Sequence, residues 1–534
     1  MQPPKRYISA SLHRFNLTMK FVRTHACEWK KSYRITHLPA GERKFGYSDQ
    51  IRQENPNGPI TMFGPIKPEH VEPKIRITKS SRESGTSDEK KEMWRSLKLA
   101  RKVKPKVVSG VHLKWMSTVM SFGDGSHGAL GLGLPAGVEP DAYEPTPVPA
   151  LPSDIVSVHA GHYHSLALTS NGHLWAWGRN NEAQLGRGLI SCGERESWHE
   201  PKRVEGLEHV NVCAAFASGV VSAAVGDDGS VWVWGKSKRG QLGLGKNITQ
   251  AVAPTKVEAL SGQNVAKVSF GWGHALARTV DGKLFGWGYS ADGRIGKMGN
   301  HFQTSPLEST FSNNAEELSS SDVEVAEKRV LEGMEEENNM PIIWEPTLVE
   351  ELHGVHVVDI ACGLDHSLVL CRDGALLSCG SNVYGQLGRA KTDLGIFPVD
   401  TSLSPVSIAA GLGHSLAICQ LAESDGSVGV GTTNVASWGW NLSSQLGREG
   451  DGNLPSLIDA LDGENPVFVS GGRAHSLALT SKGELWAWGS GKNGRLGFPS
   501  SADQVDPLCL DSLEGFQILQ AVSGFDHNLV LVAG

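Results

Sequence analysis

Short runs of alternating apolar and polar residues, joined by turns, fill most of this chain. Residues 164–177, HSLALTSNGHLWAW, show the pattern, with apolar positions alternating on both sides of a Ser-Asn-Gly turn. Comparable Gly-containing turns stand near residues 227, 281, 372 and 482. Two alternating runs joined by such a turn predict a β-hairpin, so we expect an all-β fold.

Three sequence elements recur seven times each along residues 116–534. A Trp-Gly step, or a variant of it, stands at residues 122, 177, 234, 287, 379, 438 and 488. A Leu-Gly or Ile-Gly element follows each time, in segments that begin at residues 128, 183, 240, 293, 385, 444 and 494. A Gly-x-x-His element begins at residues 161, 271, 363, 411, 472 and 524, and a degenerate copy, SGVV, begins at residue 218. This self-similarity predicts a repeat architecture.

The order of these elements predicts a closed ring. The first copy lacks its front half and the last copy lacks its back half, so the two chain ends together complete one repeat. Repeats begin about 48–61 residues apart, except for 92 residues between 271 and 363, which leaves room for four short strands each. We therefore expect a seven-bladed β-propeller with four-stranded blades, in which the segments around Phe122 and Phe525 share one sheet. The Leu-Gly element is expected to pack beneath the Trp-Gly step.

Two regions fall outside the repeats. Residues 300–345 account for the long spacing, and they are acidic, rich in Ser and without strand alternation, so we expect a disordered insertion that could recruit a partner. Residues 1–115 are a basic extension, with 25 Lys and Arg against 10 Asp and Glu. Within it, residues 1–35 place Ile8, Leu12, Phe15, Met19 and Val22 on one helical face, a pattern typical of a mitochondrial transit peptide. Residues 40–115 resemble a linker.

Other interpretations of the extension stay open. The first residues could be unstructured, and Met116 or Met120 could be the true start. The basic run at 98–106 could be a nuclear signal or a nucleic-acid contact. Mitochondrial localisation is the first expectation, with cytoplasm or nucleus as the alternative.

Composition and charge narrow the candidate functions. The 63 Gly and 15 Trp residues fit many tight turns and buried aromatic rings. Residues 116–534 carry 47 acidic against 25 basic side chains, so nucleic-acid binding through the ring is disfavoured and binding to a basic protein surface is favoured. No apolar run is long enough for a membrane span. The eight Cys residues form no C-x-x-C, so we expect buried free thiols rather than disulfides or a zinc site.

The quoted repeats resemble the regulator of chromosome condensation family. The shared pattern is G-x-x-H-[ST]-[LV]-A-L, then G-x-[LV]-[WFY]-x-W-G, then G-Q-L-G, across residues 116–534 apart from the insertion. The resemblance implies a seven-bladed propeller and relatives of three kinds: a guanine nucleotide exchange factor for a nuclear GTPase, a plant UV-B receptor, and interaction platforms that include mitochondrial members.

The residues themselves suggest no covalent catalysis, since P-loop, nucleophile-elbow and H-E-x-x-H motifs are lacking. The repeated His residues stand once per blade, too far apart to share one metal ion. We expect them to be structural, with imidazoles bonded to backbone, or to bind a partner as the resemblance implies. The candidate partner-binding residues are Asp365, His366, Asp526, His527, His164, His414 and His475, with no catalytic residue, metal or cofactor.

The leading hypothesis is a non-enzymatic scaffold that binds a protein partner through one loop face. The alternative is a guanine nucleotide exchange factor for a small GTPase, in which Asp365 and Asp526 would take part because the resemblance places acidic residues beside this His. A UV-B receptor-like role is disfavoured, because only Trp272 stands where that receptor repeats its Trp residues.

Overall fold

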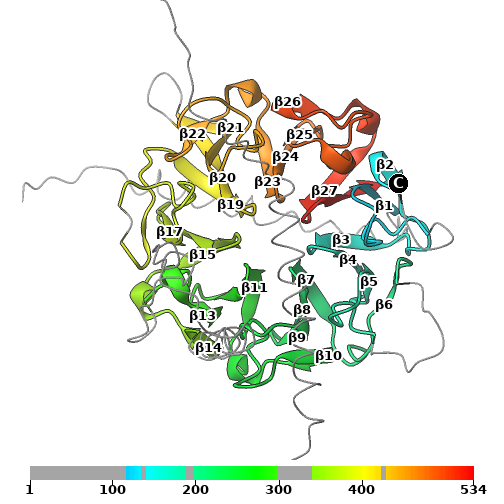
Figure 1. Ribbon diagram of the computed structural model, residues 1–534, viewed down its shortest axis with the longest axis vertical. Coiled ribbons are helices and arrows are strands. Elements are labelled where there is room, and N and C mark those ends of the chain that lie inside the picture. The colour runs from blue at the N-terminus through cyan, green and yellow to red at the C-terminus, as the bar shows by residue number, and fades with distance from the viewer. Residues whose placement is uncertain (1–115, 134–139, 188–197, 298–339, 392, 423–427) are drawn as a thin grey trace, which may run out of the picture. The chain divides into compact units, whose positions relative to one another are not determined.

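A closed ring of seven four-stranded antiparallel sheets makes up the described part of the chain (Figure 1). The computed structural model describes residues 116–133, 140–187, 198–297, 340–391, 393–422 and 428–534. The chain divides into two units, Met1–Val107 and Val108–Gly534, and all described residues belong to the second. The predicted seven-bladed propeller is therefore confirmed.

We number the blades in chain order, each with its innermost strand first. Blade 1 consists of β27 (Gln517–Ser523), β28 (His527–Ala533), β1 (Ser117–Gly123) and β2 (Ala142–Pro147). Blade 2 consists of β3 (Ile155–Ala160), β4 (His164–Thr169), β5 (Leu174–Gly178) and β6 (Lys202–Arg203), and blade 3 of β7 (Val212–Ser218), β8 (Val221–Gly226), β9 (Val231–Lys236) and β10 (Gln250–Lys256). Blade 4 consists of β11 (Val265–Phe270), β12 (His274–Thr279), β13 (Leu284–Tyr289) and β14 (Ile342–Leu348).

The remaining three blades follow the same plan. Blade 5 consists of β15 (Val357–Cys362), β16 (His366–Cys371), β17 (Leu376–Gly380) and β18 (Phe397–Pro398). Blade 6 consists of β19 (Ser404–Ala410), β20 (His414–Ala422), β21 (Val428–Gly439) and β22 (Ser456–Leu457). Blade 7 consists of β23 (Pro466–Gly471), β24 (His475–Thr480), β25 (Leu485–Gly489) and β26 (Gln504–Cys509).

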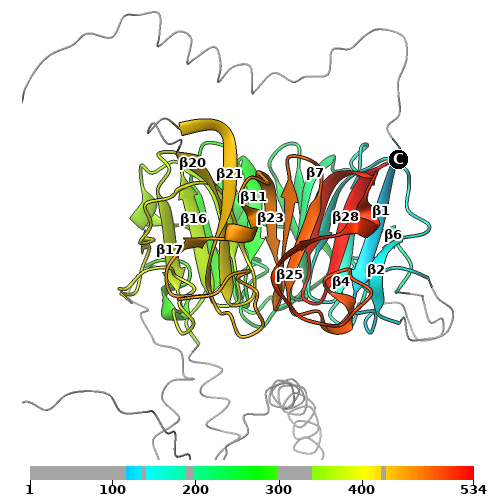
Figure 2. The same cartoon turned by 90° about the horizontal axis from the view of Figure 1, so that it is seen from above.

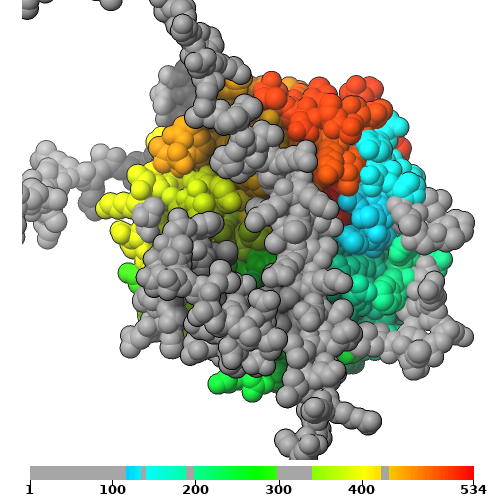
Figure 3. Space-filling model, viewed as in Figure 1, coloured from blue at the N-terminus to red at the C-terminus, as the bar shows by residue number. Residues whose placement is uncertain are grey.

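Blade 1 closes the ring with strands from both ends of the sequence. Strand β1 pairs with β28 in an antiparallel register that runs from Ser117 opposite Ala533 to Gly123 opposite His527. Figure 3 shows the red C-terminal residues directly beside the blue and cyan residues of the first strands. The predicted shared sheet is confirmed, and it leaves neither terminal half-repeat with an unpaired inner edge.

Side chains between neighbouring blades form the core. The Trp residues of five Trp-Gly steps, Trp177, Trp234, Trp287, Trp438 and Trp488, have no exposed side-chain surface. Each strand contributes alternate residues to such an interblade layer, which is why the sequence alternates so regularly. Burying these large rings between sheets contributes to the apolar stabilisation of the ring, together with the buried Leu, Val, Ile and Ala side chains.

The C-terminal boundary predicted for the insertion is wrong. Strand β14 begins at Ile342, so Ile342–Glu345, assigned to the insertion 300–345, are instead the outer strand of blade 4. Strand β14 pairs with β13, with Leu348 opposite Phe285 and Ile342 opposite Tyr289. The mixed sequence IIWEPTL hid this strand, because outer strands of a blade are half exposed and alternate weakly. Residues 1–115 and 300–339 lie outside the described residues.

The hairpin of β20 and β21 is longer than its counterparts. Figure 2 shows it rising beyond the ring on the side where the C-terminus lies. No helix among the described residues has the length and apolar character needed to cross a membrane.

Candidate functional site: the Gly-x-x-His face

Two sets of loops emerge at the same end of the ring. In each regular blade the His that begins the second strand pairs with the Gly of the Trp-Gly step, or of its variant, near the end of the third, as His164 pairs with Gly178. The Gly-x-x-His loop and the loop that leads to the Leu-Gly element therefore lie side by side. We call the surface formed by these loops the Gly-x-x-His face.

The repeated His residues join each blade to the next. Each imidazole Nε2 lies 2.7–3.0 Å from a hydroxyl or amide oxygen in the following blade. The pairs are His164–Ser222, His274–Ser367, His366–Ser415, His414–Ser476, His475–Asn528 and His527–Ser165. The expected bond to backbone is wrong, since the partner of Nε2 is a side chain. We call this set the interblade His ring.

The partners of the His ring fix its tautomer. Ser415, for example, donates its hydroxyl to the carbonyl of Gln386 at 2.9 Å. Because the Ser415 hydroxyl proton is used in that bond, its oxygen accepts a hydrogen bond from the imidazole. Nε2 of His366 therefore carries the proton. Burial lowers the pKa of His164, His414 and His475 to about 3. These imidazoles are therefore neutral at physiological pH, because a buried charge without a counter-ion is costly.

The Gly of each Gly-x-x-His element makes room for the His. A Cβ on Gly161 would lie 2.3 Å from Cε1 of His164, and one on Gly411 would lie 2.1 Å from Cε1 of His414. The backbone amide of each such Gly also donates to the carbonyl of its own His, at 2.8 Å for Gly161 and His164. The spacing in the motif thus reflects a loop that folds back on itself, so that its Gly packs directly against the imidazole of its His.

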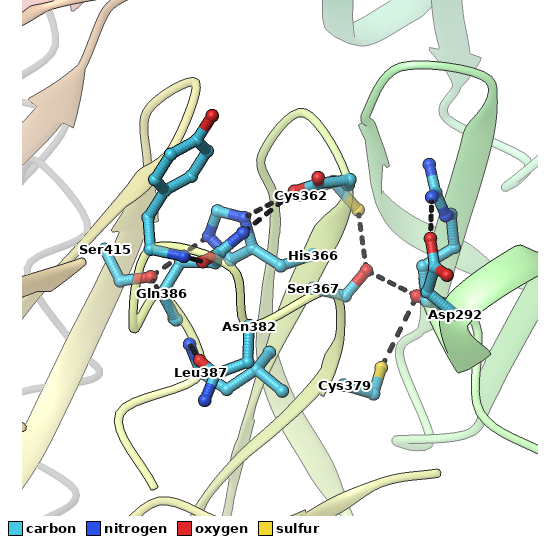
Figure 4. Close-up of polar contacts among 12 residues, drawn as sticks. Asp292, Cys362, His366, Ser367, Cys379, Asn382, Gln386, Leu387 and Ser415 are labelled. Atoms are coloured by element: carbon cyan, nitrogen blue, oxygen red, sulfur yellow. Dashed lines mark hydrogen bonds and ion pairs between the residues drawn. The ribbon is translucent and has the colours of Figure 1, made fainter. Parts of the chain in front are cut away.

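The other two elements complete the same junction. The Trp438 indole donates to the Gln386 carbonyl at 3.0 Å, the carbonyl that also accepts from Ser415. Figure 4 shows the junctions on both sides of blade 5, where the Cys379 thiol replaces the indole and contacts the Arg294 carbonyl at 3.4 Å. Gly388 allows Trp438 to approach closely, so the Leu-Gly element packs against the Trp of the next blade, not beneath its own as predicted.

The junction between blades 3 and 4 departs from this plan on both sides. Val221 stands where the other blades have His, and Ala275 stands where they have Ser or Asn. Both are fully buried in one apolar cluster that spans blades 2 to 4. A His without its acceptor would leave a buried donor unpaired, so the two losses compensate each other.

The predicted partner-binding residues are therefore of two kinds. His164, His366, His414, His475 and His527 are at most 1% exposed. They hold loops in place from beneath the face and present no surface to a partner. Asp365 and Asp526 are partly exposed on the face itself.

The two aspartates are held separately. Asp526 forms ion pairs with Arg473 at 2.8 Å and with Arg495 at 3.1 Å. Asp365 accepts from the Gln386 amide at 3.1 Å. They belong to blades 1 and 5, which are not neighbours in the ring, so the structure does not bring them into one cluster.

Sequence reasoning missed the most exposed apolar residues of this face. Val383 and Leu442 are 64% and 65% exposed, in equivalent loops of the neighbouring blades 5 and 6. The ring of Tyr384 stacks on Trp440 at 5.4 Å between them. These positions differ from repeat to repeat, so they belong to no recurring motif. An apolar residue within a polar turn is the sequence signal that could have indicated them.

A central channel opens along the ring axis. It has a volume of about 320 Å³ and is lined by the innermost strands. Lys267 and Asp359 form an ion pair at 2.6 Å within it. Among the described residues no group of His, Cys, Asp or Glu could hold a metal ion. The described Cys residues are free thiols, buried at 371, 379 and 419 but exposed at Cys213.

Comparison with known proteins agrees with this geometry. The model of the RCC1-like domain family matches residues 118–530. The ultraviolet-B receptor UVR8 of Arabidopsis thaliana is 29% identical over 403 residues, covering 74% of this chain and 78% of the receptor. The mitochondrial RCC1 domain-containing protein RUG3 of Arabidopsis thaliana is 27% identical over 426 residues, covering 77% of this chain and 72% of RUG3.

A solved structure shows the same fold. Prp20p of Saccharomyces cerevisiae is 23% identical, with a TM-score of 0.59, and the match covers 78% of this chain and 92% of Prp20p. The predicted resemblance is confirmed, since the family match extends over most of the chain. This protein belongs to the RCC1-like domain family.

Proposed function

We propose that the protein is a non-enzymatic scaffold that binds a protein partner through the Gly-x-x-His face. The observation that carries this proposal is the exposed apolar patch formed by Val383, Tyr384 and Leu442 across blades 5 and 6. Clustered apolar side chains rimmed by polar groups are typical of protein interaction sites.

The patch is held firmly. The Tyr384 amide donates to the Gln386 side-chain oxygen at 2.8 Å, and the Gln386 amide donates to Asp365 at 3.1 Å. Gly413 leaves space for the rings of Trp440 and Tyr384 to lie over its loop. A rigid apolar surface next to a partly exposed carboxylate loses little conformational entropy on binding, which favours specific association.

A pair of variants tests this proposal. Val383→Asp combined with Leu442→Asp places charges in the patch, while Val280→Asp places one on a 57% exposed residue in a hairpin turn at the other end of the ring. We expect the double variant to lose bound protein in quantitative co-purification by about tenfold or more, because charges replace the apolar contact centre. The Val280 variant should retain it; equal retention by both variants would contradict the proposal.

Guanine nucleotide exchange is the second candidate. Asp365 and Asp526 lie partly exposed on the face, at the positions that the family resemblance associates with exchange. Prp20p, which shares the fold, is described with binding properties to Gsp1p and histones. Release of labelled nucleotide from a panel of small GTPases tests it. Acceleration that falls with Asp365→Ala or Asp526→Ala would support exchange, and no acceleration by the wild type would exclude it for that panel.

The compartment stays a proposal as well. Residues 1–35 lie outside the described residues, and their basic amphipathic pattern is the ground for mitochondrial localisation; RUG3, a mitochondrial protein, is one relative. Import into isolated mitochondria with N-terminal sequencing of the product tests it. Failure of the full chain to enter would favour cytoplasm or nucleus.

A further inference from the structure

Arginine–aromatic stacks recur around the Gly-x-x-His face, and three of them carry their own carboxylate. Arg179 lies 5.2 Å from the Tyr163 ring and pairs with Glu182 at 2.7 Å. Arg473 lies 4.8 Å from the Phe525 ring and pairs with Asp526 at 2.8 Å. Arg294 lies 4.8 Å from the Tyr289 ring and pairs with Asp292 at 2.6 Å. In each stack the ring orients the guanidinium and the carboxylate neutralises it.

Arg239 forms a fourth stack that lacks a carboxylate. Its guanidinium lies 5.7 Å from the Trp272 ring and 5.5 Å from the Tyr289 ring. Among the described residues, no Asp or Glu forms an ion pair with it. The Arg294 guanidinium contacts the same Tyr289 ring, so a like charge lies close to Arg239. Within the described part of the chain, the fourth stack therefore holds a half-buried cation without a carboxylate partner.

The location of this stack is the irregular junction. Arg239 comes from blade 3 and Trp272 from blade 4, where the interblade His ring is interrupted. Gly273 makes the arrangement possible, because a Cβ there would lie 2.6 Å from Cδ of Arg239. Gly219 occupies the corresponding loop of blade 3 and has no neighbouring atom within 4 Å of its Cβ position. The junction thus combines an oriented cation, a 45% exposed Trp and open space.

We propose that Arg239 and Trp272 bind a carboxylate side chain in an acidic segment of the protein partner, with a neighbouring apolar residue of that segment against the indole. This inference rests on the proposed function and specifies one contact of it. A guanidinium fixed by aromatic rings offers parallel N–H donors to a carboxylate, a pairing stronger than a neutral hydrogen bond. The partner's carboxylate would complete the stack as Glu182, Asp292 and Asp526 complete the other three.

Two other occupants are possible on chemical grounds, and the test separates them. A second copy of this chain could supply the carboxylate. The chain's own residues 298–339 hold ten acidic and two basic side chains. The described residues that follow this segment lie at this face, since Pro341 accepts from the Ser290 amide at 2.8 Å and Ile342 lies against Gly240.

The experiment measures peptide binding to the full chain by fluorescence anisotropy. The probes are labelled twelve-residue peptides with Asp or Glu next to Phe or Leu, each matched by its Asn or Gln counterpart, and a peptide of residues 314–337. The variants are Arg239→Ala, Arg239→Lys and Trp272→Ala. The control is Lys283→Ala, which removes the same charge from a hairpin turn at the other end of the ring. Thermal unfolding of each variant confirms that it folds.

We expect some acidic peptides to bind the wild type about tenfold or more tightly than their amide counterparts, as a charge-assisted bond allows. Arg239→Ala should abolish that preference, Arg239→Lys should recover little of it, and Lys283→Ala should keep it. Equal binding of acidic and amide peptides, or a preference that survives Arg239→Ala, would overturn the inference. So would a wild-type dimer that Arg239→Ala dissociates, or binding of the 314–337 peptide alone.

The outcome is separable from that of the proposed function. A partner that is lost with the Val383 and Leu442 variant but is unaffected by Arg239→Ala would leave the scaffold proposal standing and remove this contact from it. If both the Val383 and Leu442 double variant and Arg239→Ala retain the partner, the scaffold proposal and this contact are both contradicted.

Discussion

The residues that repeat most faithfully are the ones buried most deeply. His, Ser, Trp and the two Gly residues of the regular repeats meet at interblade junctions with almost no exposed surface. Their regularity reflects the same packing arrangement, which recurs at successive junctions around the ring. Residues that differ between repeats, such as Val383, Leu442 and Arg239, reach the surface. The residues that we propose to bind a partner therefore stand at positions that differ between repeats.

A double-mutant cycle tests the role assigned to the motif Gly. Gly161→Ala should lower the free energy of unfolding by about 2–4 kcal/mol, because its Cβ would overlap the His164 imidazole, which supplies all three of the nearest atoms. In a His164→Ala background that overlap is gone, so the same change should cost much less. Urea unfolding of the four proteins measures both values. Additive costs would show that the imidazole is not what requires Gly at this position.

At the scale of elements, the junctions are not equivalent. Neighbouring Gly-x-x-His loops are joined by backbone bonds, such as Leu364 amide to Leu412 carbonyl at 2.9 Å and Leu412 amide to Gly472 carbonyl at 3.0 Å. No bond of this kind between described residues joins the loop at Gly219 to that at Trp272. The junction between blades 3 and 4 depends instead on apolar packing, on the stack of Arg239 with Trp272, and on Gln241. The Gln241 side-chain amide donates to the Gly271 carbonyl at 2.6 Å, and the Gln241 backbone carbonyl accepts from the Trp287 indole at 2.7 Å.

Hydrogen exchange should reveal that difference. We expect amides in residues 216–222 to exchange faster than those in 361–367 and 409–415, since fewer interblade hydrogen bonds oppose local opening there. Peptide-level exchange followed by mass spectrometry makes the comparison within one sample. Equal protection of the three segments would mean that the apolar cluster fully replaces the missing bonds.

The sequence predicted the hairpins, the blade number and the closing sheet, because alternation and turn chemistry are local signals. It did not predict which atoms meet between blades. His164 and its acceptor Ser222 are 58 residues apart, and His527 and Ser165 are 362 apart, so only the closed ring brings them together. The partly exposed aspartates were found through the family resemblance, whereas Val383 and Arg239 belong to no repeated motif. Strand β14 was missed because its exposed side weakens the alternation.

At the scale of the whole molecule, the ring carries six buried neutral imidazoles. Burial lowers the pKa of His366 and His527 to about 4 and that of His274 well below its usual value, in addition to the three at about 3. An unfolded His titrates near pH 6.5. Below that pH the unfolded chain binds more protons than the folded ring, so stability is present above about pH 6.5 and falls as the pH falls toward 4.

This linkage gives a measurable slope. Each such His should cost about 1.4 kcal/mol of unfolding free energy per pH unit well below pH 6. Urea unfolding between pH 7 and pH 5 should show a steep decline, and His475→Gln should reduce the slope by the share of one residue. A slope that His475→Gln leaves unchanged would show that this imidazole is not buried neutral.

The central claim is that the motif residues build the ring while the exposed loops of the Gly-x-x-His face bind the partner. A photo-crosslinking amino acid placed at Leu442, and separately at Val280 on the other end of the ring, tests it most directly in cells. We expect one defined protein adduct from position 442 that is absent from position 280. An adduct formed only from position 280 would contradict the claim.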